Sequence, residues 1–400
     1  MDKEIENYFI DREEEEQPVF AKLLDDLKKN FSDDLLDALP SLSFIMLKPD
    51  AYLRGLVPSV LTFLKENNVY PVHYRLKQLD AAEIDELYMF VKPKYIESWW
   101  IMDKTYRLAP CCPVIVVGKK ENYDHLSLRI RSLVGPTTPT LGDESNIRYK
   151  FRGAHRIFNM IHGTDDPAAA IREALVFFSL DDLRDALNAA KKLERGIDDP
   201  SCDLQHEHLV PNEVVQLDLQ IAKYNLKRAL LHRWTTESSS VREMLGNTSK
   251  FIGVLKRLRD IGDRLEKLLE TEKEIIVELT SPRERKSRLR NLYYYELRSC
   301  SLAQDAIQQL MLSISRESLL EREVRTAAMS RLAPIEKCIE MSRALTMSVE
   351  FKECPFDNYL SWVRFLDIEL DSFDEANLHA AWSVAATEFV DFELKFPEEP

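Results

Sequence analysis

Hydrophobic and polar residues follow two different rhythms along this chain. Between residues 41 and 180, short apolar runs of strand length alternate with helical patterns. The expected strands are residues 43–47, 70–79, 113–117 and 157–161, and the expected helices are 57–66, 81–91, 95–102, 122–134 and 167–178. Their order, βαββαβ, predicts a ferredoxin-like α+β sheet with helices on one face.

The rest of the chain shows helical spacing alone. Apolar residues at Phe20, Leu24 and Leu27 predict an amphipathic helix near the N-terminus, beside a run of glutamates expected to face solvent. After residue 180 we expect no strand. The expected helices are 183–193, 213–234, 240–279, 281–313, 317–347 and 356–392, the last with a break near Asp371. The predicted parts are an acidic N-terminal helical extension (1–40), the α+β domain (41–180), a helix and linker (181–211) and an all-α helical bundle (212–400).

Composition agrees with this division. Only 10 of the 400 residues are glycine, and six of these lie between Gly55 and Gly163. Glycine costs a helix interior roughly 1 kcal/mol relative to alanine, so its scarcity elsewhere favours helices. The net charge of −14 divides into −8 for residues 1–40, +3 for 41–180 and −9 for 181–400. This balance argues against nucleic-acid binding, and the cationic middle is where an anionic ligand is expected.

The cysteines and the apolar runs indicate a compartment. No apolar run reaches the roughly 18 residues of a membrane span. The six cysteines form no pair of CxxC units, which favours a reducing, cytoplasmic environment and no membrane association. Adjacent Cys111 and Cys112 are expected to be buried strand thiols, with a redox pair as the alternative.

The candidate chemistry lies in the cationic middle. No Walker A or GxGxxG sequence is present, so phosphate binding would depend on side chains. The cations of this region are Lys48, Arg54, Arg131, Arg148, Arg152 and Arg156. An arginine fork suits phosphate oxygens and stays charged. His162, at the end of an expected strand, is a possible nucleophile, and Glu173 lies eleven residues later, where it could hold one ring nitrogen.

Two segments resemble the nucleoside diphosphate kinase family. The first is Phe44-Ile45-Met46-Leu47-Lys48-Pro49-Asp50, continuing to Arg54-Gly55-Leu56-Val57, and it is similar to the strand-KPD and RGLV signature. The second runs from Arg156 to Asp165 and resembles the NxxHG[ST]D signature. Between them, Arg131, Gly135, Thr137, Pro139 and Arg148 follow in the order typical of the family. The resemblance covers residues 41–180.

The resemblance implies a role for each matched residue. His162 would take the γ-phosphoryl group, Glu173 would orient its ring and Tyr88 would lie beside the transferring group. Arg131, Thr137 and Arg148 would bind phosphates, and Thr164 would make a hydrogen bond nearby. Lys48 and Asn159 would contact the sugar, and Lys48 would also act as a catalytic residue near the transferred phosphate. Mg²⁺ would arrive on the nucleotide, because the sequence shows no carboxylate cage.

Three departures from the family pattern affect these expectations. Ala51 replaces the glycine that usually follows KPD. The segment between Tyr88 and Pro113 looks about five residues longer than usual, so the base-stacking aromatic is assigned first to Tyr95 and second to Trp99. About one extra residue lies between Arg148 and Asn159.

Two kinds of function follow from this organisation. The first is a phosphotransferase that moves a γ-phosphoryl group from a nucleoside triphosphate to a nucleoside diphosphate through a phosphohistidine. The alternative is a nucleotide-sensing or interaction protein that signals through its helical domain. We also expect a homo-oligomer, and the helical domain would serve regulation, oligomerisation or binding of a protein partner.

Overall fold

The chain forms two units, each with its own core. The structure is a computed structural model that describes residues 2–196, 200–202, 206–246, 248–279, 282–346 and 355–388. The first unit extends to Leu217 and the second begins at Asp218. No helix in these ranges combines the length and the apolarity needed to cross a bilayer.

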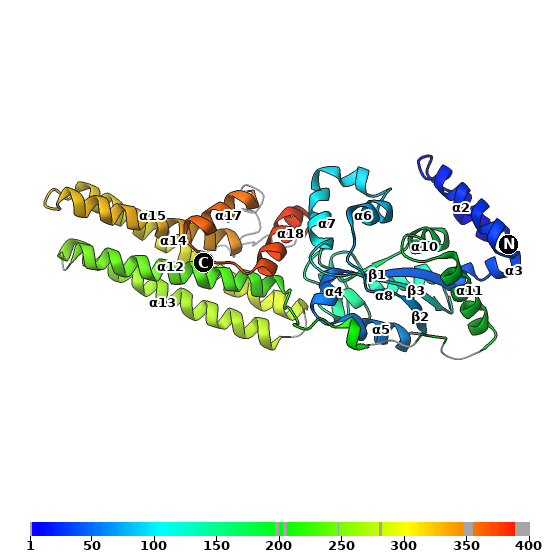
Figure 1. Cartoon of the computed structure of the whole chain (residues 1–400). Coiled ribbons are helices and arrows are strands. Elements are labelled where there is room, and N and C mark those ends of the chain that lie inside the picture. Colours follow the sequence, from blue (N-terminus) through cyan, green and yellow to red (C-terminus); the bar gives the residue numbers. More distant parts are fainter. Residues whose placement is uncertain are drawn as a thin grey trace. The chain divides into compact units, whose positions relative to one another are not determined.

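A four-stranded antiparallel sheet organises the first unit (Figure 1). The strands are β1 (Leu42–Leu47), β2 (Val69–Tyr74), β3 (Cys112–Gly118) and β4 (Ile161–Gly163), in the order β2-β3-β1-β4. Central β1 pairs with β3 from Leu42↔Val117 to Leu47↔Cys112, and with β4 from Ile45↔Gly163 to Leu47↔Ile161. This order confirms the ferredoxin-like α+β prediction.

The helices of the first unit cover both faces of the sheet, so the expectation of helices on one face is wrong. The helices are α1 (Lys3–Ile10), α2 (Gln17–Asn30), α3 (Asp33–Leu36), α4 (Pro49–Leu53), α5 (Val57–Glu66), α6 (Ala81–Leu87), α7 (Trp99–Tyr106), α8 (Leu126–Val134), α9 (Ile147–Lys150), α10 (Pro167–Ala174) and α11 (Leu180–Glu194), with 3₁₀ turns at Leu39–Ser41, Lys92–Ser98, Pro139–Leu141 and His206–Leu209. Alternate β1 residues point to opposite sides. Phe44 and Met46 join a core with α1, α2, α10 and α11, while Ile45 and Leu47 join a second core with α5 and α8. The N-terminal extension and α11 therefore help to cover the face of the sheet to which Phe44 and Met46 point (Figure 1).

The predicted strand over residues 157–161 is also wrong, because β4 begins only at Ile161. Met160 has φ of 69°, which lies outside the extended region. Just before it, the Nδ1 atom of His155 accepts a hydrogen bond from the Ile157 amide at 3.2 Å. The residues before β4 are therefore a turn stabilised by local side-chain contacts, and apolar composition alone did not reveal it.

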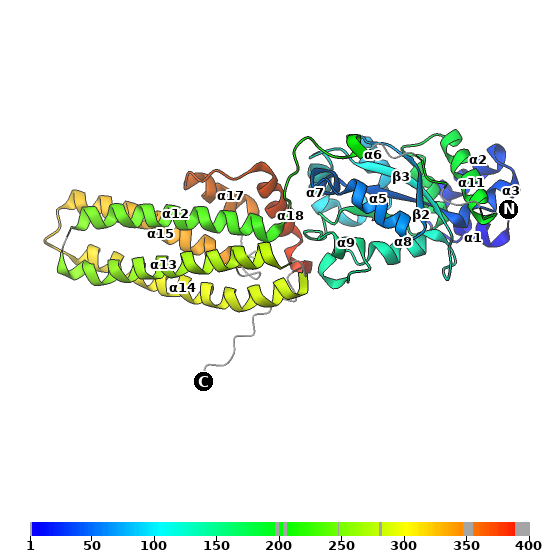
Figure 2. The same ribbon diagram turned by 90° about the horizontal axis from the view of Figure 1, so that it is seen from below.

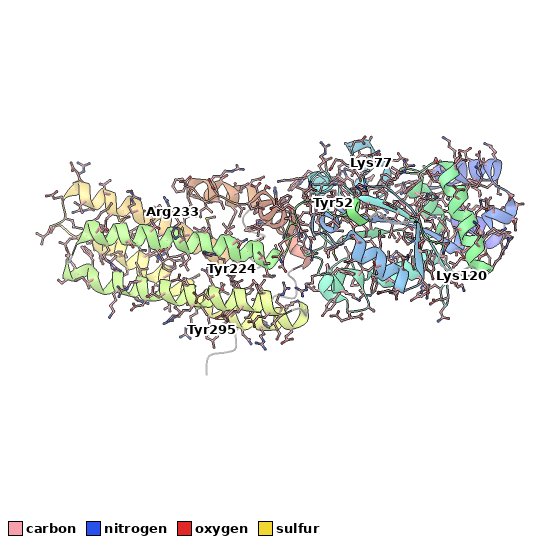
Figure 3. All side chains as sticks on the ribbon, turned by 60° about the horizontal axis from the view of Figure 1, so that its bottom comes forward. Tyr52, Lys77, Lys120, Tyr224, Arg233 and Tyr295 are labelled. Atoms are coloured by element: carbon pink, nitrogen blue, oxygen red, sulfur yellow. The ribbon has the colours of Figure 1, made fainter. Side chains whose placement is uncertain are left out.

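The second unit is helical throughout its described residues (Figures 1 and 2). Its helices are α12 (Leu219–Leu245), α13 (Ser249–Glu278), α14 (Pro282–Arg316), α15 (Arg322–Thr346), α17 (Phe356–Phe365) and α18 (Ser372–Glu388). The four long helices lie alongside one another, as both views show. Side chains such as Tyr295 on α14 extend outward from this bundle (Figure 3). The expected bundle is confirmed.

Candidate active site

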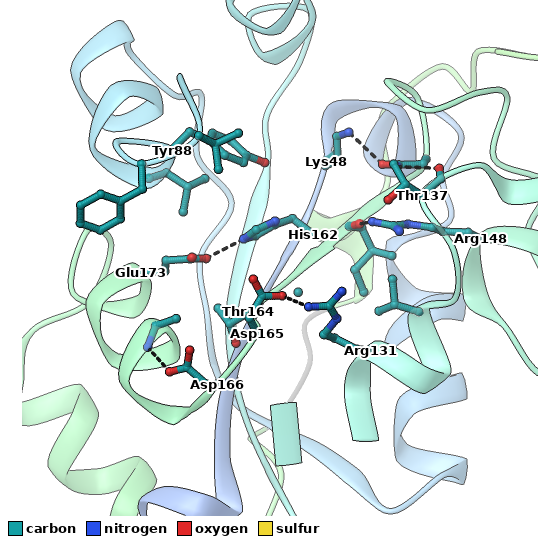
Figure 4. A pocket seen from close by; sticks show the side chains of 18 of the residues that line it. Lys48, Tyr88, Arg131, Thr137, Arg148, His162, Thr164, Asp165, Asp166 and Glu173 are labelled. Carbon is teal, nitrogen blue, oxygen red and sulfur yellow. Dashed lines mark hydrogen bonds and ion pairs between the residues drawn. The ribbon is translucent and has the colours of Figure 1, made fainter. Parts of the chain in front are cut away.

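A pocket of about 780 Å³ lies where the ends of β1 and β4 meet α8, α9 and α10 (Figure 4). It gathers residues that are far apart in the sequence. The predicted residues that line it are Lys48, Tyr88, Arg131, Thr137, Arg148, Asn159, His162, Thr164 and Glu173. The antiparallel register explains this gathering, because it brings the end of β1 beside the start of β4.

His162 and Glu173 form a hydrogen-bonded pair. The Nε2 atom of His162 lies 2.6 Å from Oε2 of Glu173, and the histidine side chain is 22% exposed toward the pocket. The other carboxylate oxygen of Glu173 accepts a hydrogen bond from Nη2 of Arg172 at 3.1 Å. Arg172 is itself fixed, since it donates to the carbonyl oxygens of Glu86 and Leu87. A carboxylate on Nε2 favours the tautomer with the proton on Nε2 and the lone pair on Nδ1.

Tyr88 packs beside the histidine. Its ring meets the His162 ring edge to face, with centroids 5.4 Å apart, and its hydroxyl lies 2.5 Å from the hydroxyl of Tyr106. Burial raises the pKa of Tyr88 well above its usual value. The phenol is therefore neutral at physiological pH, where it can donate a hydrogen bond without adding negative charge near an anionic ligand.

Lys48 is a buried cation at the start of α4. Its Nζ atom donates to the Ile157 carbonyl and, at 2.9 Å, to Oδ1 of Asn159. Burial lowers the pKa of Lys48 to about 8, with Arg148 acting in the same direction and Asp50 opposing it. The carboxylate of Asp50 is engaged elsewhere, because its Oδ2 accepts the Met160 amide at 2.9 Å. Lys48 thus makes its hydrogen bonds to neutral oxygens, and Asp50 acts on its charge without a direct hydrogen bond to it.

Asn159 connects Lys48 to Thr137 through two hydrogen bonds. Its Nδ2 atom donates to the backbone oxygen of Thr137 at 3.2 Å, while its Oδ1 accepts from Lys48. The turn before β4, noted above, places Asn159 in this position. Three residues predicted to contact one ligand are therefore linked by direct hydrogen bonds.

The predicted phosphate-binding arginines differ in their surroundings. Arg148 donates to the carbonyl oxygens of Gly135 (3.0 Å) and Ile161 (2.8 Å), and burial lowers its pKa to about 10. Arg131 is half exposed and pairs with Asp165. Arg54, one of the cations noted in the sequence, lies outside the pocket lining and instead donates to the carbonyl oxygens of Phe151 and Arg152. Arg148 is fixed in place, and Arg131 is held only by a surface ion pair that contributes little stability.

Thr164 directs its hydroxyl away from the ligand space. Its Oγ1 lies 3.0 Å from the Ser43 hydroxyl and 3.3 Å from the Ser127 hydroxyl, and it donates to the Phe44 carbonyl. This buried group joins β1, α8 and the segment after β4. The geometry favours a positioning role for Thr164 rather than direct contact with a nucleotide.

The structure does not bring Tyr95 into the pocket. Tyr95 interrupts the 3₁₀ segment Lys92–Ser98 with φ of −132°, and it is 58% exposed. Trp99, the second choice, is buried behind Tyr88 with ring centroids 5.7 Å apart. The aromatic residues that line the pocket are instead Tyr88, Phe20 and Phe90. Neither Tyr95 nor Trp99 lines the pocket, so the structure does not place either predicted base-stacking aromatic there.

Several lining residues were missed by the sequence analysis. The N-terminal extension contributes Arg12, Glu16 and Phe20. Glu16 belongs to the run expected to face solvent, yet its side chain is only 19% exposed. No motif marks these residues. The available signal was the amphipathic pattern that includes Phe20, because an apolar helix face of that kind requires a partner surface.

The donor set of the described residues does not form a protein metal cage. No group of three or more histidine, cysteine, aspartate or glutamate side chains is placed to hold an ion in these residues. At the pocket, Asp165 pairs with Arg131 and Asp166 pairs with Arg12. These residues fit a divalent ion carried mainly by phosphate oxygens.

The adjacent cysteines are confirmed as buried thiols. Cys111 contributes to the core on one face of the sheet and Cys112 to the core on the other. Burial raises the pKa of Cys112 to about 12 and that of Cys111 further. Both thiols are free and, because they remain protonated, unreactive.

The fold and pocket define an α+β protein with a carboxylate-held histidine among fixed cations. Comparison with known proteins agrees: residues 42–183 match the family model described as nucleoside diphosphate kinase. The nucleoside diphosphate kinase of Desulfitobacterium hafniense is 31% identical over 151 residues, which cover 38% of this chain and 95% of the relative. That of Methanothermobacter thermautotrophicus is 31% identical over 138 residues, covering 34% and 85%.

A solved structure gives a similar match. The halophilic nucleoside diphosphate kinase of Halobacterium salinarum, in complex with CDP, is 25% identical, with a TM-score of 0.32 and coverage of 35% of this chain and 89% of that one. The chain belongs to the nucleoside diphosphate kinase family and is therefore an enzyme of the transferase class.

Proposed function

We propose that the protein transfers the γ-phosphoryl group of a nucleoside triphosphate to a nucleoside diphosphate through a phosphohistidine at His162. The observation that carries this proposal is the 2.6 Å contact between Nε2 of His162 and Glu173. It leaves the lone pair of Nδ1 for attack, and in the described residues no hydrogen bond is made to Nδ1.

The reaction balances in two half-reactions. Nδ1 attacks the γ-phosphorus, the bond from phosphorus to the bridging oxygen breaks, and the nucleoside diphosphate leaves with the electron pair. A terminal oxygen of a second nucleoside diphosphate then attacks the phosphorus of the phosphohistidine. The bond from phosphorus to Nδ1 breaks, and its electron pair returns to Nδ1, which restores the neutral ring. Glu173 stabilises the positive charge that the ring acquires as Nδ1 bonds to phosphorus.

The surrounding cations support this chemistry. Lys48, Arg131 and Arg148 line the pocket on the side of His162 opposite Glu173 (Figure 4), and they supply the positive charge that phosphoryl transfer requires when charge spreads over the phosphate oxygens. We propose that Thr137 and the two arginines bind phosphates and that Lys48 and Asn159 contact the sugar. Mg²⁺ bound to the nucleotide would screen the phosphate charge.

The test is direct detection of the intermediate. The protein is incubated with γ-labelled ATP and Mg²⁺, and the label is expected on protein in an acid-labile, alkali-stable bond. The His162→Ala variant should carry no label. His73→Ala is the matched control, because His73 also lies on a strand, is 28% exposed and has a carboxylate nearby, with Nδ1 3.9 Å from Asp182. An unlabelled parent, or a labelled His162→Ala variant, contradicts the proposal.

For the helical unit we propose a role in oligomerisation, regulation or partner binding, in a cytoplasmic protein. The described cysteines are all free thiols, which is consistent with a reducing compartment. Light scattering of the full chain and of a chain ending at Leu217 tests the oligomer role. Identical assembly states for the two would exclude it. A nucleotide-sensing role loses its support if turnover is ordinary and unchanged by that truncation.

A further inference from the structure

Residues 2–31 of the N-terminal extension pack directly against α10, the helix that carries Glu173. Phe9 of α1 and Phe20 and Leu24 of α2 belong to the same core as Ala168 and Ile171 of α10. The extension precedes residues 42–183, which match the family model, so it adds to the part shared with the relatives. Its side chains Arg12, Glu16 and Phe20 nevertheless line the pocket.

Arg12 makes the first connection to α10. Its Nη2 lies 2.5 Å from Oδ1 of Asp166, which is the N-cap of α10 and accepts the Ala169 amide at 2.9 Å. Arg12 is fixed from behind, since its Nε donates to the Tyr8 carbonyl at 2.7 Å. Its side chain is only 13% exposed. A partly buried, hydrogen-bonded pair of this kind holds its partner more firmly than a surface ion pair does.

Phe20 makes the second connection. Its ring stacks on the ring of Phe90, with centroids 5.9 Å apart and planes inclined by 24°. The guanidinium of Arg172 lies over Phe90, 5.5 Å from the ring centroid. Arg172 in turn donates to Glu173. This connection therefore ends at the carboxylate that holds His162.

We propose that Arg12 and Phe20 are positioning residues of the active site, which fix α10 and thereby the contact between Glu173 and Nε2 of His162. Arg12 acts at the first turn of α10, and Phe20 acts through Phe90 and Arg172 near its end. The inference deepens the proposed function and rests on it. Loss of either connection weakens control of the histidine tautomer without removing a phosphate-binding group.

The test uses the full chain with point variants. Arg12→Ala removes the cation. Asp166→Asn removes the charge partner but keeps a good helix cap, because asparagine caps as well as aspartate. The double variant completes the cycle. Lys28→Ala is the control, since Lys28 forms an ion pair within the extension, 2.7 Å from Glu6, and lies outside the pocket lining.

Two readouts are measured. The first is the ¹⁵N spectrum of the histidine rings, where His162 is assigned by its absence from His162→Ala and reports the tautomer. The second is the dependence of turnover on substrate concentration. Arg12→Ala and Asp166→Asn are each expected to shift His162 from the Nε2-protonated tautomer toward a mixture and to lower kcat about tenfold with little change in KM.

The double variant should lose no more than Arg12→Ala alone, because Asp166→Asn breaks only the pair that Arg12→Ala already removes. Arg12→Ala also takes the guanidinium away from the Phe20 ring, whose centroid lies 4.0 Å from it. Lys28→Ala should match the parent in both readouts. A parent-like tautomer in Arg12→Ala and Asp166→Asn, or additive losses in the double variant, would overturn the inference. If the parent forms no phosphohistidine, the proposed function fails, and the ring spectra still decide whether the extension controls the histidine.

Discussion

Both units bury lysines, and Lys48 of the first unit and Lys227 of the second are held in opposite ways. In the first unit, Nζ of Lys48 is bonded to the Ile157 carbonyl and the Asn159 amide oxygen, both neutral. In the second unit, Nζ of Lys227 lies 2.8 Å from both carboxylate oxygens of Glu272 and 2.8 Å from one of Glu296. Burial lowers the pKa of Lys48 to about 8. Burial also disfavours the charged form of Lys227, but the two glutamates outweigh this effect and raise the pKa of Lys227.

The difference separates a site from a core. Lys227 and its carboxylates lie at most 3% exposed, and Lys227 is paired directly with both Glu272 and Glu296. Lys48 lines a pocket, its hydrogen bonds go to neutral oxygens, and Asp50 offsets its charge only in part. An uncompensated buried charge costs stability, and that cost is offset when an anion binds. Burial of a charge alone does not mark a functional site; Lys48 differs from Lys227 because it lacks a direct ion pair and lines a pocket that can admit an anion.

The largest expected effect is on the core lysine. Lys227→Met should destabilise the protein by about 3–5 kcal/mol, because it leaves two buried glutamates without their cation. Denaturant unfolding followed by circular dichroism measures this loss. Lys250→Met is the control, since the Lys250–Glu317 pair has a lysine that is 59% exposed, and it should change stability by less than about 0.5 kcal/mol. Equal effects of the two variants would contradict the comparison.

Lys48→Met should produce the opposite outcome. We expect kcat/KM to fall about 10²–10³-fold, the usual result of removing one preorganised charge from a transition state, with a change in stability below about 1 kcal/mol. The same substitution at exposed Lys120 should leave kcat/KM unchanged. Steady-state kinetics and unfolding are measured on the same samples. A Lys48→Met protein that unfolds like Lys227→Met but keeps its activity would remove the distinction.

The pH dependence sharpens the comparison further. Lys48 has its pKa lowered from 10.5 to about 8, so between these values the unfolded lysine holds a proton that the folded one has released. This group therefore adds stability as pH rises from 8 toward 10.5, but it loses its charge for phosphate. We expect kcat/KM to fall about tenfold per pH unit above 8. Lys48→Arg should move this fall to higher pH, and an unmoved profile would assign it to another group.

The smallest effect is expected at Tyr293, which lies beside the group formed by Lys227, Glu272 and Glu296. The hydroxyl of Tyr293 lies 3.0 Å from Glu272 and 2.9 Å from Gln220. Tyr293→Phe should cost about 1 kcal/mol, since it removes one hydrogen-bonding group while Lys227 still neutralises the carboxylates. Turnover should be unaffected. A loss as large as that of Lys227→Met would show that the hydroxyl, and not the lysine, governs the cluster.

Local pattern predicted much of the fold. The helix at Val57–Glu66 has the bounds that its apolar spacing indicated, and β1 differs by one residue. Periodicity could not reveal the turn before β4, because side-chain hydrogen bonds at His155 and the backbone at Met160 override the apolar run. Periodicity also could not show that the N-terminal extension covers the face of the sheet to which Phe44 points, because that packing joins residues over 150 positions apart.

For the site, too, the sequence could predict some residues and not others. Motif spacing pointed to His162, Glu173, Lys48, Arg131 and Arg148, which all line the pocket, because these positions fall at or near the ends of regular elements whose register fixes them. Arg12 and Phe20 have no such spacing and became visible only with the tertiary contacts. The assignment of Tyr95 to the pocket was wrong, because Tyr95 lies in an irregular segment where sequence spacing does not fix the direction of a side chain.

The sheet order has a consequence for how the chain folds. Strand β1 ends at Leu47, yet its neighbours are residues 112–117 and 161–163, so it has no partner until long stretches of chain have been closed into loops. The helices of the second unit form through hydrogen bonds between residues four apart, although α12 later packs on α15, with α13 and α14 between them in the sequence. Folding slows as contacts become more distant along the chain. We therefore expect refolding in two kinetic phases, a fast gain of helix followed by a slower return of phosphotransfer, with the catalytic half setting the pace.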